Sequence, residues 1–308
     1  MKEPQTFVTI RNYENMNTIT TPFCTILYLT TALKKSDSIQ YQSVQTPLHW
    51  ACAYGYPDVV TLLVARKCHL NPRDLGGLTP LMRAIQGQRE QCTSILLKHG
   101  ADPKLADTFN NNTLLHYAAY GQNTAIVSEL QQYNCDFEAQ NKDGFTPLLL
   151  AVKENNKEMV EFFLMNGANV NAVDNNQRTP LHLGCVYGYP DVVTLLVERK
   201  CHLNPCDLEG LTPLMRAIQC EQEECISILL KHGADTKLAD TFNNNTPLHY
   251  AVCVQKTATV SELLQYNCDL EAQNKVEEHL LYDKVFYELK CVIRSLRIII
   301  DLCSSEKN

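Results

Sequence analysis

The chain has 308 residues, of which 45% are hydrophobic and 20% are charged, the ordinary balance of a folded protein. Its formal net charge of −7 and its lack of a concentrated Lys/Arg block argue against a nucleic-acid partner, since such binding needs a cationic surface that displaces counterions. No apolar stretch approaches the roughly 20 residues of a membrane-spanning helix, which argues against stable membrane insertion.

The first 45 residues carry none of the repeated motifs found further along the chain. Their most apolar part, residues 22–33 (PFCTILYLTTAL), is too short to span a bilayer. The basic lead-in of a signal peptide is also missing, because Lys2 and Arg11 lie far from this stretch. We therefore interpret residues 1–45 as a degenerate N-terminal segment that caps the repeats, with a signal or anchor segment as the alternative.

Seven copies of one motif, Thr-Pro-Leu-His or a close variant, follow between residues 46 and 278. The motif is intact at Thr46, Thr179 and Thr246, and the copies begin 33 or 34 residues apart. A fixed period of this length indicates a solenoid of stacked units. The predicted repeats are 46–78, 79–112, 113–145, 146–178, 179–211, 212–245 and 246–278.

Each repeat has the pattern of two short helices and a tight hairpin. The threonine can cap the first helix, and proline at the first helical position loses no hydrogen bond there. In the first repeat this predicts a helix over 48–54, a turn over 55–57, and a second helix with apolar residues at helical spacing. An Asp/Gly hairpin follows at 74–77. Glycine, which tolerates the left-handed conformation, closes several second helices; it is found at Gly100, Gly167 and Gly233.

This unit resembles the ankyrin repeat, and the resemblance covers about three quarters of the chain. It implies an all-α repeat fold, an ankyrin solenoid of stacked helix-turn-helix units with β-hairpin loops. Within ankyrin proteins, the phrases at 58–64, 80–86 and 171–174 are similar to the POTE-type mammalian family. Members of that family carry a coiled-coil tail after the repeats, whereas no long heptad region follows the repeats here.

A longer period of 133 residues is also present. Residues 46–142 and 179–275 agree at about four positions in five. Both copies contain an asparagine-rich hairpin with one extra residue, at 107–112 and 240–245, where Asn can replace Gly at a positive φ. The duplicated surface predicts binding of two copies of one partner, or of one partner with a repeated motif.

Eight of the fourteen cysteines recur at matching places in the duplicated blocks, as Cys68 and Cys201 do. They lack the close Cys-x-x-Cys pairs of zinc sites, and the chain is longer than a secreted disulfide scaffold. A free buried cysteine behaves as a small apolar residue. We expect reduced core cysteines, no metal site, and a cytoplasmic or nuclear protein.

No set of catalytic residues is recognisable. His49, His182 and His249 lie near cysteines, but they occupy one place in the repeat, which indicates an architectural role. The resemblance implies that this histidine forms hydrogen bonds between neighbouring repeats. No Walker-type phosphate loop is present. We expect no enzymatic activity, no cofactor and no small-molecule substrate.

Residues 279–308 are predicted to form an amphipathic helix and a tail. Apolar residues recur at steps of three and four, and charged residues lie between them. A helix that caps the last repeat is the first interpretation. A partner helix or the start of a coiled coil, and a membrane-surface helix, are the alternatives.

The resemblance implies a binding surface formed by hairpin tips and by the exposed side of each first helix. The predicted hairpin residues are Leu75, Leu78, Phe109, Phe145, Arg178, Leu208, Glu209, Leu211 and Phe242. The predicted helix residues are Tyr54, Gln86, Tyr120, Lys153, Glu154, Tyr187 and Gln219. Apolar hairpin tips favour a protein partner. The alternative is that these side chains pack against the neighbouring hairpin.

The sequence therefore predicts a non-enzymatic scaffold that binds an unidentified protein. An adaptor subunit of an enzyme complex, such as a ubiquitin-ligase substrate receptor, is one alternative, and a truncated family paralogue without a dedicated partner is another.

Overall fold

The computed structural model describes residues 45–269 and 272–275, which contain seven pairs of short helices. The first helices of the pairs are α2 (Pro47–Tyr54), α4 (Pro80–Gln86), α6 (Leu114–Ala119), α8 (Pro147–Lys153), α10 (Pro180–Tyr187), α12 (Pro213–Gln219) and α14 (Pro247–Cys253). The second helices are α3 (Pro57–Ala65), α5 (Glu90–Lys98), α7 (Thr124–Gln131), α9 (Lys157–Met165), α11 (Pro190–Glu198), α13 (Glu223–Lys231) and α15 (Thr257–Gln265). The predicted N-terminal cap and C-terminal helix lie outside the described residues.

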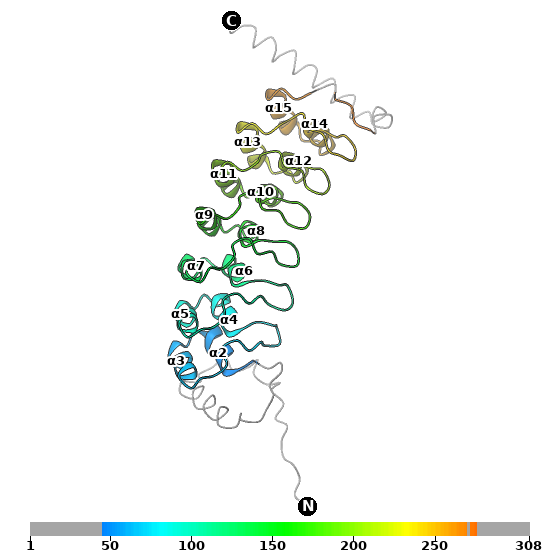
Figure 1. The fold of residues 1–308 in the computed structure, drawn as a ribbon. Coiled ribbons are helices and arrows are strands. Elements are labelled where there is room, and N and C mark those ends of the chain that lie inside the picture. The colour runs from blue at the N-terminus through cyan, green and yellow to red at the C-terminus, as the bar shows by residue number, and fades with distance from the viewer. Residues whose placement is uncertain (1–44, 270–271, 276–308) are drawn as a thin grey trace, which may run out of the picture.

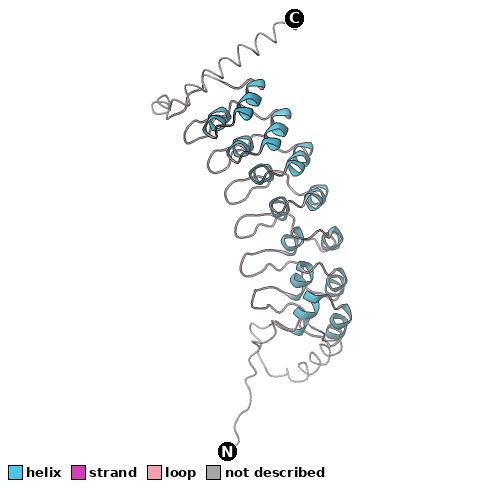
Figure 2. Ribbon diagram, turned by 180° about the vertical axis from the view of Figure 1, so that it is seen from behind, coloured by secondary structure: helices cyan, strands magenta, loops and turns pink. Residues whose placement is uncertain are grey.

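The pairs stack into a solenoid of two helical columns (Figure 1). The first helices form one column, in which α2 packs on α4 and α4 on α6, and the second helices form the other. The long loops between repeats all project from the side of the first helices, as the view from behind also shows (Figure 2). No helix in the described part of the chain combines the length and apolarity needed to cross a bilayer.

The repeated motif begins each first helix in the predicted way. In the first repeat, the Thr46 side chain accepts a hydrogen bond from the backbone N–H of His49, and Pro47 occupies the first helical turn. The imidazole of His49 accepts at Nδ1 from both the N–H and the hydroxyl of Thr46. Its Nε2 donates to the carbonyl of Leu78, 3.0 Å away, at the end of the next hairpin. Leu78 belongs to the same repeat, 46–78, so this bond lies within one repeat, and the expected bond between neighbouring repeats is not what the structure shows at His49.

The same bond within a repeat recurs at two other histidines. His116 Nε2 donates to the carbonyl of Phe145 at 2.8 Å, and His182 Nε2 donates to the carbonyl of Leu211 at 3.0 Å. In two repeats methionine replaces the histidine, and the Sδ atom of Met82 or Met215 accepts from the threonine N–H instead. The histidines thus tie each hairpin to the first helix of its own repeat.

The predicted turns and helix ends are confirmed at the residues that need a positive φ. Gly100, Gly167 and Gly233 follow second helices with φ of 91°, 87° and 88°. Asn111 and Asn244, in the longer hairpins, both have φ of 58°, the left-handed conformation in which Asn replaces Gly.

The interior is a continuous apolar layer between the two helical columns, and it contains the cysteines that recur in the duplicated blocks. Cys206 and Cys253 are instead exposed, so the expectation of core cysteines is wrong for these two. Cys52, Cys92, Cys185 and Cys225 are almost fully buried. Burial raises the pKa of the Cys225 thiol to about 11, which disfavours the reactive thiolate. Within the described residues, no cluster of His, Cys, Asp or Glu side chains is arranged to hold a metal ion.

The loops follow the path of hairpins, but no described residue is in a β-strand. In the first loop the ends are joined by a bond from the N–H of Asp74 to the carbonyl of Leu78, and the tip by one from Gly77 to Asp74. The tip of this loop is therefore a short hydrogen-bonded turn, and side chains supply the other bonds that hold the loop.

Candidate functional site

The predicted site residues lie on two adjacent parts of the solenoid, the projecting loops and the C-terminal ends of the first helices. Both parts are on the same side of the stack (Figure 2). We call this surface the hairpin–helix face and define it by its exposed residues, Tyr54, Leu75, Gln86, Phe109, Tyr120, Lys153, Glu154, Tyr187, Leu208, Glu209, Gln219 and Phe242.

Four apolar side chains at the loop tips are largely in solvent. Leu75 is 70% exposed, Phe109 60%, Leu208 60% and Phe242 62%. Such exposure is unusual for large apolar residues on a folded surface when they recur along one face. The four side chains belong to the loops at the two ends of the array, and the loops between them have polar tips.

The expectation that all the apolar loop residues are exposed is wrong for three of them. Leu78 is 8% exposed, Phe145 7% and Leu211 3%. Each is the residue whose carbonyl accepts the bond from a histidine, so its backbone is held against the first helix of its own repeat. The side chain consequently turns inward between repeats. Their burial favours the alternative interpretation, in which these side chains pack against the neighbouring hairpin.

Substitutions of two leucines in one loop would measure the difference between a buried and an exposed loop position. Leu211→Ser is expected to lower the free energy of unfolding by about 2–5 kcal/mol, because it removes buried apolar volume. Leu208→Ser, three residues away, is expected to change it by less than about 0.5 kcal/mol, because Leu208 is exposed. Urea unfolding followed by circular dichroism checks both values, and equal effects would contradict the assignment of Leu211 to the interior.

A buried carboxylate holds the base of most loops. In the first loop, Asp74 Oδ1 accepts from the N–H groups of Gly76 and Leu78 at 2.9 and 3.0 Å. Its Oδ2 accepts from the guanidinium of Arg83 in α4, at 2.8 Å from Nε and 2.6 Å from Nη2. Burial opposes ionisation of Asp74, but the Leu78 N–H and Arg83 outweigh it and hold the pKa below its ordinary value.

The helix position that pairs with this carboxylate varies between repeats, and the loop residue varies with it. Arg216 pairs with Asp207 at 2.6 Å, as Arg83 does with Asp74. Tyr117 donates its hydroxyl to Asp107 at 2.9 Å, and Tyr250 donates to Asp240 at 3.1 Å. Burial and the adjacent Asp240 raise the pKa of Tyr250 to about 12, so the hydroxyl stays a donor.

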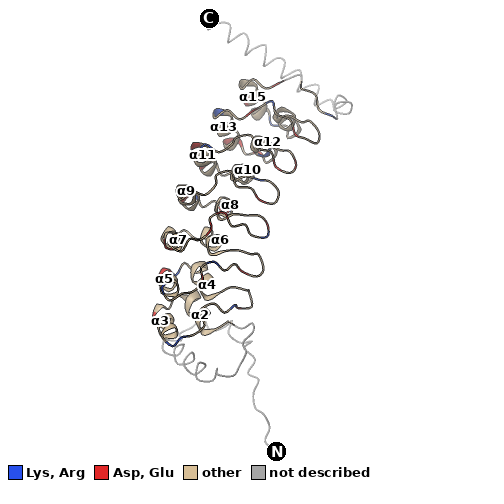
Figure 3. Cartoon of the chain, viewed as in Figure 1, with Lys and Arg blue, Asp and Glu red and all other residues tan. Residues whose placement is uncertain are grey.

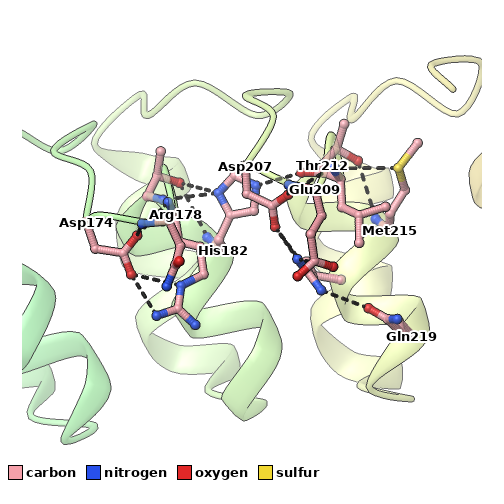
Figure 4. Close-up of polar contacts among 12 residues, drawn as sticks. Asp174, Arg178, His182, Asp207, Glu209, Thr212, Met215 and Gln219 are labelled. Atoms are coloured by element: carbon pink, nitrogen blue, oxygen red, sulfur yellow. Dashed lines mark hydrogen bonds and ion pairs between the residues drawn. The ribbon is translucent and has the colours of Figure 1, made fainter. Parts of the chain in front are cut away.

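In two repeats the helix position is leucine, and the loop compensates in two different ways. Where α10 has Leu183, Asp174 takes its counter-charge from Arg178 of its own loop, 2.7 Å away (Figure 4). Where α8 has Leu150, the loop residue is the neutral Asn141, which needs no counter-charge. Arg178 was predicted to contact a partner, but its guanidinium is committed to Asp174, which gives it a structural role.

Arg216 also connects two predicted site residues. Its Nη2 lies 3.0 Å from a carboxylate oxygen of Glu209, and its Nη1 donates to Gln219 Oε1 at 3.1 Å (Figure 4). Arg83 makes the equivalent bond to Gln86, but Gly76 occupies the place of Glu209 in that loop. The loop and helix parts of the face are therefore joined by side-chain bonds.

The loops that carry the two exposed phenylalanines are held by the same set of bonds. Asp107 Oδ1 accepts from the N–H of Phe109 at 2.8 Å. Lys142 of the next loop donates its Nζ to the carbonyl of Thr108 at 3.2 Å and its N–H to Asn110 at 2.9 Å. Asp240 and Lys275 make the corresponding bonds around Phe242. Both phenylalanines are thus exposed on loops whose backbones are fixed.

One aromatic cluster was missed from the sequence. Trp50, which is 42% exposed, stacks on Tyr54 with ring centroids 5.5 Å apart, and Tyr54 stacks on Tyr56 at 6.4 Å. Trp50 occupies the helix position of Arg83 and Arg216, so its alignment could have identified it. Tyr187 stacks on Tyr189 in the duplicated block, where leucine replaces the tryptophan.

Charge is mixed along the solenoid. Basic and acidic residues are interspersed over successive repeats, and neither sign forms a continuous stripe (Figure 3). Lys153 lies 5.2 Å from the ring centroid of Phe145, which places a cation over an almost fully buried aromatic ring. The face therefore combines apolar tips with a polar surround of both signs.

Comparison with known proteins identifies the same repeat. A family model described as ankyrin repeats (3 copies) matches residues 23–107, 99–174, 115–207 and 200–274. Inversin from Homo sapiens is 27% identical over 255 residues, which cover 79% of this chain and 24% of inversin. The chain thus spans about a quarter of the length of that relative.

Two solved structures have the same architecture. The ankyrin repeat domain of human ASB11 matches with a TM-score of 0.64 and 25% identity, over 73% of this chain and 99% of that domain. The ankyrin repeat domain of Bcl-3, a member of the IkappaB protein family, matches with a TM-score of 0.64 and 27% identity, over 72% of this chain and 99% of that domain.

Proposed function

Because the chain belongs to the ankyrin-repeat family, we propose that it is a non-enzymatic scaffold that binds a protein through the hairpin–helix face. The observation that carries this proposal is the set of exposed apolar tips, Leu75, Phe109, Leu208 and Phe242, on loops fixed by buried carboxylates. A rigid exposed aromatic loses little conformational freedom on binding, so most of its burial contributes to affinity.

The surround of the tips supports a protein partner over other ligands. An interface of this kind has apolar anchors in a polar rim, and Arg83, Arg216 and Lys153 with their acidic and amide neighbours supply that rim. Interspersed charges of both signs do not suit the phosphate backbone of nucleic acid, which requires concentrated positive charge.

The test compares two variants that each remove two exposed apolar side chains. Phe109→Ser with Phe242→Ser removes them from the face, whereas Leu62→Ser with Met165→Ser removes them from the second-helix column. Proteins captured from a cell lysate by the native chain are expected to be lost, at least tenfold, with the face variant only. Circular dichroism establishes that both variants fold.

Two results would contradict the proposal. Equal capture by the native chain and the face variant would place binding elsewhere on the molecule. Equal loss in both variants would show that general surface hydrophobicity, and not this face, retains the captured proteins.

Two finer assignments accompany the proposal. The phrases at 58–64, 80–86 and 171–174 support an affiliation with the POTE-type family, and the free cysteines of the described repeats support a reducing compartment, the cytoplasm or nucleus. An adaptor role would depend on a recruitment segment after the repeats, which falls in residues outside the described part of the chain.

A further inference from the structure

The duplication gives the face two equivalent pairs of apolar tips. Leu75 and Phe109 lie on consecutive loops of the first block, and Leu208 and Phe242 lie at the same places in the second. The bonds that fix Phe109 recur at Phe242, with Asp240 in place of Asp107. We name the pairs Leu75/Phe109 and Leu208/Phe242 the first and second tip pairs.

Polar loops separate the two tip pairs. At the corresponding positions the third loop has Lys142 and Asp143, and the fourth has Asn175 and Asn176, all of them exposed. The exposed apolar surface of the tips is therefore not one continuous strip. It consists of two separate patches, with two polar repeats between them.

From this arrangement, which rests on the proposed function of the face, we propose that the two tip pairs bind two directly repeated copies of one apolar–acidic motif within a single extended partner segment. Successive repeats of a solenoid are related by a small rotation and a translation, so both tip pairs face the partner in the same orientation. A two-fold symmetric dimer presents its two copies in opposite directions and cannot satisfy both pairs. A segment with a direct repeat satisfies both.

The spacing of the tip pairs sets the length between the two motifs. The pairs are four repeats apart, and neighbouring packed helices lie about 8–10 Å apart, so the separation is about 32–40 Å. An extended chain covers about 3.3–3.6 Å per residue, so the motifs must be separated by at least about 9–12 residues.

The charge around the tips indicates the acidic part of the proposed apolar–acidic motif. Lys142 lies beside Phe109 and Lys275 beside Phe242, each with its Nζ at a carbonyl of the phenylalanine loop. An ammonium has three donors, so each lysine retains the capacity to bind a carboxylate. The nearby acids are not shared, because Gly76 replaces Glu209 and Val276 replaces Asp143 in the other block. The common features are two apolar side chains and one cation.

The test uses a 12-residue peptide selected from a random library against the full chain with Leu208→Ser and Phe242→Ser, in which only the first tip pair is intact. Isothermal titration of that peptide is expected to give two sites on the native chain. It should give one site on each of two variants, one with Leu75 and Phe109 changed to serine and one with Leu208 and Phe242 changed to serine (the paired variants). The affinities of these two sites should agree within about threefold. The fourfold variant, with all four residues changed to serine, should give no site. The selected peptides are expected to contain an acidic residue next to an apolar one.

The second arm joins two copies of the peptide head to tail through a flexible linker of about 15 residues. Because the second binding event is then intramolecular, the tandem peptide is expected to bind the native chain at least tenfold more tightly than the single peptide. On either paired variant it should gain no more than about twofold. The matched control joins one copy of the peptide to a scrambled copy through the same linker; it carries a single motif and should gain nothing on the native chain.

The outcomes separate this inference from the proposed function. One site on the native chain, or no gain from the long tandem, would overturn the direct-repeat inference while leaving the face as a binding surface. Binding that persists on the fourfold variant, or failure to select any peptide, would contradict both.

Discussion

Replacement of Arg83 by leucine is expected to lower the free energy of unfolding by about 3–5 kcal/mol, because it leaves the Asp74 carboxylate buried without its counter-charge. The Asp74 side chain is 1% exposed, and Arg83 Nη2 is 2.6 Å from its Oδ2. Asp74→Asn is expected to cost about 1.5–3 kcal/mol, the range for a lost hydrogen bond to a charged group, because Arg83 is partly exposed and retains Gln86.

The double variant Asp74→Asn with Arg83→Leu is expected to be more stable than Arg83→Leu alone. It reproduces the combination that the chain itself uses in the repeat of Asn141 and Leu150, a neutral amide opposite an apolar helix position. A double-mutant cycle measured by urea unfolding should give a coupling of about 2–3 kcal/mol. Strictly additive effects would contradict the view that loop and helix residues form one electrostatic unit.

The duplicated block supplies an internal control for this cycle. Arg216 has a second acidic partner, Glu209 at 3.0 Å, which Arg83 lacks. Asp207→Asn is therefore expected to cost less than Asp74→Asn. If the two single variants cost the same, Glu209 contributes nothing to holding Arg216.

Acidification is expected to destabilise the protein well before its carboxylates become protonated. Burial lowers the pKa of His49, His116 and His182, although a backbone bond and nearby acids act in the opposite direction. Nδ1 of His182 accepts from both the N–H and the hydroxyl of Thr179, and Nε2 donates to Leu211. A second proton on Nδ1 would face two donors, so the folded state requires neutral imidazole.

The direction follows from proton linkage. Each of these histidines has a lower pKa in the folded state than the ordinary 6.5 of the unfolded chain, so below about pH 6.5 the unfolded state binds more protons. Stability is therefore complete above that pH and is lost as the pH falls from about 6.5 toward the folded pKa. Each unit of pKa depression corresponds to about 1.4 kcal/mol per histidine.

Urea midpoints measured between pH 7.5 and 5 check this expectation. Methionine fills the same position at Met82 and Met215, so the triple variant of His49, His116 and His182 to Met is expected to fold and to lose most of the pH dependence. Replacement of the exposed His69 by Asn serves as the control and should leave the slope unchanged. An unchanged slope in the triple variant would assign the acid sensitivity to other groups.

The helix caps and the positive-φ turns could be predicted from the sequence, because each depends on residues close together in the chain. A threonine three residues before a histidine can form the capping hydrogen bond within that short segment. A glycine or asparagine at a turn allows a positive φ at that residue. Seven copies at a fixed spacing then imply stacking, since one helix pair cannot bury its own apolar face.

The exposure of individual loop residues could not be predicted in this way. Leu75 and Leu78 are the same residue type three positions apart, yet one is 70% and the other 8% exposed. The difference arises because His49 and Asp74 fix the backbone at Leu78 and direct its side chain between repeats.

The sequence by itself determined the solenoid, its repeat length and its duplication, because these are properties of local pattern and period. Only the tertiary structure decided which apolar loop residues remain exposed and that Arg178 pairs with Asp174. Those outcomes depend on which side chains, from different parts of a loop or from adjacent elements, contact the same buried atoms. A local sequence pattern does not contain that information.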